Sequence, residues 1–255
     1  MAQTEEQPRL RNLLAEHWLL LALAPGSLLL ILLLSAPIPQ DPAYHLFADT
    51  RSFMSIPNAL DILSNLPFML VGGYGLWICR SCHAGAAWVT LFAGVTLVAA
   101  GSAYYHAVPD NETLVWDRLP MTIGFMGLFA ALLTEYVHWS LRHLLVPAVT
   151  IGIASIGVWV WTGDLRVYAW VQFMPLLTLP VLIWRYAASH THQHLLFWGL
   201  GAYLSAKVSE HFDTEVYALT GSLVSGHSLK HLLAAAGVLL IAEMLRRRTV
   251  MPTST

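Results

Sequence analysis

Long apolar runs separated by short polar stretches fill almost the whole chain. A helix needs about 20 residues to cross the hydrocarbon core of a bilayer, and no strand-like alternation competes with the helical pattern. The sequence therefore predicts an all-α, polytopic transmembrane helix bundle. We expect eight spans, at about Trp18–Ser35, Pro57–Ile78, Ala86–His106, Leu119–Val137, Leu144–Trp161, Tyr168–Tyr186, Leu195–His211 and His227–Leu245.

The composition supports a membrane protein. Apolar residues make up 56% of the 255 residues and charged residues only 11%, whereas soluble domains carry about a quarter charged residues. A net charge of −2 gives no argument for a nucleic-acid partner. The first apolar run is followed by Ser35-Ala-Pro-Ile-Pro and not by a small-residue cleavage site. We therefore expect a retained helix rather than a cleaved signal peptide.

The arginines predict the orientation of the bundle. Cytoplasmic loops carry an excess of Lys and Arg, and eight spans put both termini on one side. That side holds Arg9, Arg11, Arg80, Arg142, Arg185, Arg246, Arg247 and Arg248, and the other side holds only Arg51, Arg118 and Arg166. We expect both termini to be cytoplasmic in a bacterial inner membrane, with residues 1–17 as an N-terminal segment and residues 246–255 as a basic tail.

Two short stretches bring polar groups to the outer ends of the spans. Ser102 and His106 lie four residues apart, as do His227 and His231, and Asp117 follows the first pair. Side chains four residues apart share one face of a helix. The predicted orientation puts all five at one leaflet depth, which favours a metal site.

Zinc is the expected ion. Catalytic zinc commonly uses three protein ligands and keeps a position for water, whose pKa it lowers. We predict His106, His227 and His231 as ligands. Asp117 is the expected acid/base, and Ser102 is the expected oxyanion donor.

Other interpretations of these residues remain open. Ser102 can bond back to the carbonyl of Val98, and Asp117 can cap the N-terminus of the following helix. His106 and His227 can be interfacial side chains with wet ring edges. His231 sits a turn inside the membrane, where ionisable residues are usually functional.

The second span carries another polar face, formed by Asn58, Asp61 and Asn65. This face can join helices, or it can bind a hard cation such as calcium together with Asp49 from the preceding loop. Pro67 within the span predicts a kink. Lys207 and Glu210, three residues apart in the seventh span, are most simply a helix-surface pair.

Several motifs resemble the alkaline ceramidase family. The family belongs to a superfamily of membrane hydrolases that includes adiponectin-receptor-like proteins, and the resemblance covers about Asp49 to Glu243. The motifs are Ile56-Pro-Asn-Ala-Leu-Asp-Ile-Leu-Ser-Asn-Leu, Gly101-Ser-Ala-Tyr-Tyr-His106, Trp116-Asp-Arg-Leu-Pro-Met and Gly226-His-Ser-Leu-Lys-His231.

The resemblance implies a seven-helix core, here residues 57–245, that holds an intramembrane zinc. Its serine, first histidine, aspartate and final histidine pair fall on the five residues already singled out. The implied reaction is hydrolysis of the ceramide amide to a sphingoid base and a fatty acid. The chain departs from the family in its extra N-terminal span. It also lacks the tryptophan- and glutamate-rich calcium segment, and Asn58 stands where that family has glutamate.

The predicted function is therefore zinc-dependent intramembrane hydrolysis of ceramide or a related N-acyl lipid, with the membrane lipid as partner. The alternative is a metal-stabilised, receptor-like membrane protein that binds lipid without turnover. A transporter with a proton relay fits less well, because the polar groups cluster at one leaflet and not at the bilayer midplane.

Overall fold

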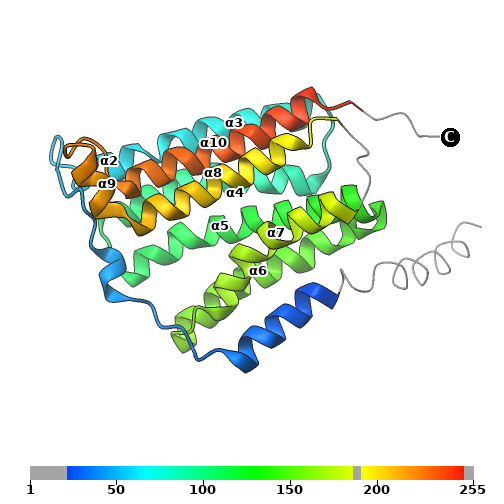
Figure 1. Cartoon of the computed structure of the whole chain (residues 1–255), viewed down its shortest axis with the longest axis horizontal. Coiled ribbons are helices and arrows are strands. Elements are labelled where there is room, and N and C mark those ends of the chain that lie inside the picture. Colours follow the sequence, from blue (N-terminus) through cyan, green and yellow to red (C-terminus); the bar gives the residue numbers. More distant parts are fainter. Residues whose placement is uncertain (1–21, 186–190, 250–255) are drawn as a thin grey trace, which may run out of the picture.

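The structure is a computed structural model, and it describes residues 22–185 and 191–249. Within these residues the chain is all-helical (Figure 1), and no strand is formed. Its elements are η1 (Pro42–His45), α2 (Ala59–Leu63), α3 (Leu66–Ser81), α4 (Ala86–Ala107), α5 (Asn111–Leu132), η2 (Leu133–Val137), η3 (Trp139–Leu144), α6 (Leu145–Thr162), α7 (Arg166–Arg185), α8 (His194–His211), α9 (Asp213–Leu219) and α10 (Gly226–Arg247).

Six helical stretches in the described part of the chain are long and apolar enough to cross a membrane. They correspond to the second through sixth and the eighth predicted spans, and they fit an integral, multi-pass membrane protein. The stretches are Ala59–Ser81, Ala86–Ala107, Asn111–Val137, Trp139–Thr162, Arg166–Arg185 and Gly226–Arg247.

The other two predicted spans are not among these six stretches. The seventh forms α8, whose apolar character is reduced by Lys207, Glu210 and His211 near its end. The first is seen only as the short apolar helix Ala22–Leu34. Residues 1–21, which contain the predicted N-terminal segment and the start of this span, lie outside the described residues, as does the tail beyond residue 249.

Glycines let the central helices approach closely. A Cβ atom at Gly94 of α4 would lie 2.6 Å from the backbone nitrogen of Gly124 in α5. A Cβ atom at Gly237 of α10 would lie 2.9 Å from the carbonyl oxygen of Gly199 in α8. Such small residues are common where membrane helices pack, because lipid offers no hydrophobic drive for association. Helices α4 with α5, and α8 with α10, thereby form two close pairs at the centre of the bundle (Figure 1).

Helix α5 begins earlier than the sequence indicated. Its N-cap is Asp110, whose carboxylate accepts a hydrogen bond of 2.7 Å from the backbone of Thr113 in a capping box. The expected start was Leu119, because the polar residues before it read as a loop. Asp117 therefore lies inside the helix, and the alternative that Asp117 caps it is wrong.

The second span is interrupted as Pro67 predicted. Helix α2 ends at Leu63 and α3 begins at Leu66, with Pro67 in its first turn. Proline fits there because the first turn of a helix needs no intrahelical N–H bond. The interruption brings the side chains of Ser64 and Asn65 into the bundle, where both are buried.

Candidate active site

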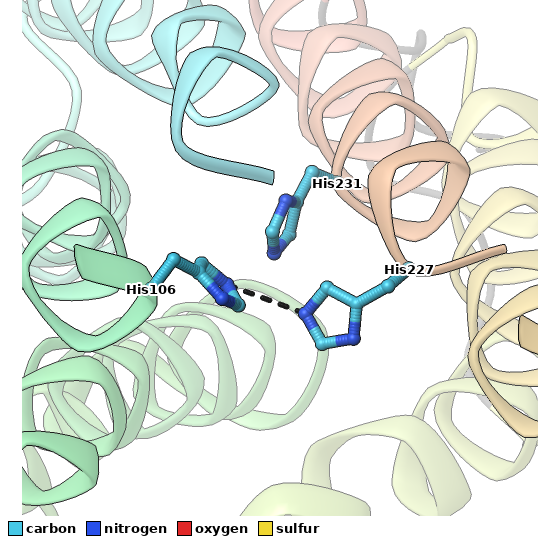
Figure 2. A group of neighbouring side chains, drawn as sticks. All are labelled: His106, His227 and His231. Atoms are coloured by element: carbon cyan, nitrogen blue, oxygen red, sulfur yellow. Dashed lines mark hydrogen bonds between the residues drawn. The ribbon is translucent and has the colours of Figure 1, made fainter. Parts of the chain in front are cut away.

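Three histidines meet at one end of the bundle (Figure 2). His106 comes from the last turn of α4, and His227 and His231 come from the first two turns of α10. All three are buried, and one ring nitrogen from each lies within 4.8 Å of the others. As predicted, His227 and His231 share one face of α10, and their side chains lie close to that of His106 at the end of α4.

Local contacts fix where α10 begins and hence where its histidines point. Ser225 is the N-cap, and its hydroxyl accepts a 2.9 Å hydrogen bond from the backbone of Ser228. The Asp213 carboxylate accepts a 2.7 Å bond from the backbone N–H of His227. Gly226 is required by close packing, since a Cβ atom there would lie 2.1 Å from the carbonyl oxygen of Ser209.

The ring nitrogens lie close enough together that the three histidines could hold a metal ion. His231 Nδ1 lies 2.7 Å from the hydroxyl of Ser64, which orients the ring and leaves Nε2 for a ligand. His106 Nε2 and His227 Nε2 lie 3.3 Å apart, within hydrogen-bond distance, and which of them donates depends on the ring tautomers. His106 Nδ1 is buried without a partner among the described residues. Three imidazoles in this arrangement fit zinc.

Ser102 lies on α4, one turn before His106, and Asp117 lies on the adjacent helix α5. Both are buried, and both line the same cavity as His231. The Ser102 hydroxyl lies beside the Asp117 carboxylate and is close enough to interact with it. Helices α4 and α5 can meet here only because residue 101 is glycine: a Cβ atom at Gly101 would lie 2.0 Å from the carbonyl oxygen of Trp116.

Substituting Gly101 tests this packing. Gly101→Ala is expected to lower the free energy of unfolding by about 1–3 kcal/mol, since overpacking forces the backbone apart, and to lower activity by separating Ser102 from Asp117. Unfolding in detergent and turnover would be measured together. Gly157→Ala is the matched control, because a Cβ atom there meets nothing within 4 Å. Equal behaviour of the two variants would contradict the prediction.

A cavity of about 450 Å³ runs from this site into the bundle. Its inner wall is apolar and is formed by side chains of α4, α5, α7, α8 and α10, among them Val95, Leu128, Leu179, Leu196 and Ile241. Its polar end is formed by Ser102, Asp117, Arg118, Lys207, Glu210, Lys230 and His231. The cavity thus offers an apolar channel that ends at chemically active groups.

Sequence reasoning missed part of the polar end. The Lys230 ammonium lies 3.0 Å from a Glu210 carboxylate oxygen and 2.9 Å from His227 Nε2. Glu210 also pairs with Lys207 and accepts a 3.1 Å bond from the hydroxyl of Tyr44. Lys207 and Glu210 therefore face the cavity and are not a simple surface pair. Burial, with Glu210 nearby, raises the pKa of Tyr44 well above its usual value.

The second polar cluster does not converge on one point. Asp49 is bound through both oxygens by Arg51, at 2.8 and 2.6 Å, and this hydrogen bonding lowers the pKa of Asp49. Asn58 donates to the carbonyl oxygen of His106 at 2.9 Å. Asp49 and Asn58 therefore have hydrogen-bond partners outside the cluster.

The other two members of the cluster are Asp61, which bonds to the start of α10, and Asn65, which bonds to the backbone of Asp61. Asp61 accepts bonds from the hydroxyls of Ser225 and Ser228, at 3.2 and 2.6 Å, which ties α2 to the start of α10. Asn65 donates to the Asp61 carbonyl oxygen at 2.7 Å. This arrangement favours the helix-joining interpretation of the cluster.

Comparison with known proteins gives one clear match. The family model described as ceramidase matches residues 53–253, which include every residue of the histidine cluster, Ser102 and Asp117. No curated protein matches the chain. Membership of this family implies an amide-hydrolysing enzyme that acts on a lipid such as ceramide. With the matched region covering most of its length, the chain belongs to the ceramidase family.

Proposed function

We propose that this protein is a zinc-dependent intramembrane hydrolase that cleaves the amide bond of ceramide or a related N-acyl lipid. The products are a fatty acid and an amine. The observation that carries the proposal is the cluster of three buried histidines, one of which, His231, lines the polar end of a largely apolar cavity. An ionisable cluster within membrane helices is costly and is usually retained for function.

His106, His227 and His231 would hold the metal. When bound, zinc supplies a Lewis acid that lowers the pKa of water and polarises a carbonyl. Ser64 fixes the ring of His231 through Nδ1, and Asn58 fixes the end of α4 through the carbonyl oxygen of His106. The chain thereby orients its ligands before any substrate enters.

Asp117 would move the proton. Its carboxylate accepts a proton from the attacking water and passes that proton to the amide nitrogen as the carbon–nitrogen bond breaks. The Ser102 hydroxyl would donate a hydrogen bond to the carbonyl oxygen, which gains negative charge in the transition state. Both side chains are buried at the head of the cavity, where water is scarce and such interactions are strong.

The apolar part of the cavity would hold the acyl chain. Its walls carry aliphatic side chains from five helices, so the cavity suits a hydrocarbon tail whose amide reaches the polar end. In the segment before α2, the ring of Phe47 lies 4.8 Å, centre to centre, from the rings of both His106 and His227.

The arginine distribution supports an inner-membrane orientation with both termini cytoplasmic. In that orientation the histidine cluster faces the periplasmic leaflet, and residues 57–245 form the hydrolase core. A substrate would then enter from the outer half of the bilayer.

The test combines metal analysis with a hydrolysis assay. Purified protein is expected to contain about one zinc per chain. It should release fatty acid from an N-acyl lipid in proportion to enzyme, lose activity with a chelator and regain it with zinc. Absence of a stoichiometric transition metal would contradict the proposal. Bound metal without product after long incubation would favour a receptor-like protein instead.

A further inference from the structure

The polar end of the cavity carries positively charged side chains, which a neutral lipid does not need for recognition. Three cations face it, namely Arg118, Lys207 and Lys230. The amine half of ceramide carries hydroxyl groups and no charge, so hydrogen-bonding side chains alone would recognise it. Cations inside a membrane protein are costly and are normally paired or functional.

Arg118 is the most unusual of the three. It is only 5% exposed, and its guanidinium lies over the rings of Trp159 and Tyr168, at 4.4 and 4.8 Å. Its Nη2 donates to the side-chain oxygen of Gln40 at 2.7 Å, whereas Nη1 is buried without a hydrogen-bond partner. Among the ion pairs formed within residues 22–185 and 191–249, none involves Arg118.

Lys230 is only partly compensated. Its ammonium donates to Glu210 and to Nε2 of His227. A metal on His227 would use the same lone pair, which would leave Lys230 with Glu210 alone. That single carboxylate also serves Lys207 and the hydroxyl of Tyr44.

Three carboxylates also line the cavity and offset the charge of the three cations. Asp117 and Glu210 line the polar end, and Asp41 lies exposed at the mouth, where it caps η1. These three balance the three cations, so a divalent metal would leave the wall positive. Asp61 and Asp213 bond to groups at the start of α10 and do not line the cavity.

Tyr44 connects the two cationic groups. The guanidinium of Arg118 lies 5.5 Å from the centre of the Tyr44 ring, and the hydroxyl of the same ring bonds to Glu210, the partner of Lys230. Arg118 and Lys230 therefore border the same cavity, which Asp117 also lines. Arginine and lysine are the side chains that recognise carboxylate and phosphate groups.

We propose that Arg118 and Lys230 bind an acidic group, a carboxylate or a phosphate, on the amine half of the substrate. The preferred substrate is then an N-acyl lipid with an anionic head, and neutral ceramide is a poorer one. This assignment rests on the proposed amide hydrolysis and adds to it the charge of the head group. Hydrolysis consumes one water and yields a fatty acid and an acidic amine.

The test compares matched lipids with the zinc-loaded wild-type protein. N-palmitoylserine is paired with N-palmitoylserinol, in which a hydroxymethyl group replaces the carboxylate, and ceramide 1-phosphate is paired with ceramide. We expect kcat/KM to be roughly tenfold or more higher for the acidic member of at least one pair, about 1.4 kcal/mol. The pair that responds identifies the acidic group.

The outcomes separate this assignment from the proposed function. Hydrolysis of both neutral lipids at rates equal to or above those of their acidic partners overturns the assignment and leaves the hydrolase standing. If no lipid is hydrolysed, the hydrolase fails and binding decides the assignment. Thermal stabilisation of the protein incubated with zinc should then be larger with N-palmitoylserine or ceramide 1-phosphate than with its neutral partner, and equal stabilisation overturns the assignment.

Single substitutions test which side chains cause the preference for acidic lipids. Lys230→Met and Arg118→Met are each expected to bring the acidic-to-neutral ratio towards one, and Glu210→Gln to raise it. Arg246→Met removes the same charge at the far end of α10, where Arg246 pairs with Glu243, and should keep the ratio. An unchanged ratio in both Lys230→Met and Arg118→Met overturns the assignment. If a variant does not fold, the wild-type comparison decides.

Discussion

Asp117→Asn is expected to keep the metal and to lower kcat by about 10²- to 10⁴-fold, the usual contribution of a positioned acid/base. The amide has almost the shape of the carboxylate, so the packing of α5 against α4 is preserved. An amide cannot accept the proton of the attacking water or return it to the leaving amine. Asp117 is not one of the three clustered metal-ligand candidates, and metal content should therefore stay near that of the wild type.

The measurement is zinc content together with fatty-acid release from the same preparation. Asp110→Asn is the matched control on the same helix. Asp110 caps α5 outside the cavity, and asparagine is an equally good N-cap. Activity in Asp110→Asn should therefore be close to that of the wild type. Turnover of Asp117→Asn within a few fold of the wild type would remove Asp117 from the proposed chemistry.

Periodicity predicted the histidine cluster but not the distances within it. A spacing of four residues was enough to put His227 and His231 on one face of α10. Their approach to His106 depends on packing between helices far apart in sequence. The bond between Ser64 and His231 joins positions separated by 167 residues, and no local pattern contains that contact.

Helix limits and charge pairs were the weaker predictions, for physical reasons. The segment after Pro109 is polar enough to resemble a loop, but the capping box of Asp110 and Thr113 starts α5 there. Lys207 and Glu210 have the spacing of a surface pair. In the structure both side chains face the cavity. There Glu210 also pairs with Lys230, which lies 20 residues after it in the sequence.

His231→Ala is expected to abolish both zinc binding and turnover. Two imidazoles would remain, one fewer than the three protein ligands that catalytic zinc commonly has. Ser64→Ala should have a smaller effect of the same kind. It leaves all three ligands but removes the group that orients His231, and the loss of such an orienting partner typically costs about 10- to 100-fold in metal affinity.

Zinc titration of the metal-free protein, followed by thermal unfolding with and without zinc, measures both effects. Zinc should raise the unfolding temperature of the wild type, raise that of Ser64→Ala only at higher zinc concentration, and leave that of His231→Ala unchanged. His211→Ala is the control, because His211 lies exposed at the end of α8 and outside the cluster. Stoichiometric zinc in His231→Ala would place the metal elsewhere, and the three histidines would then need another explanation for their burial.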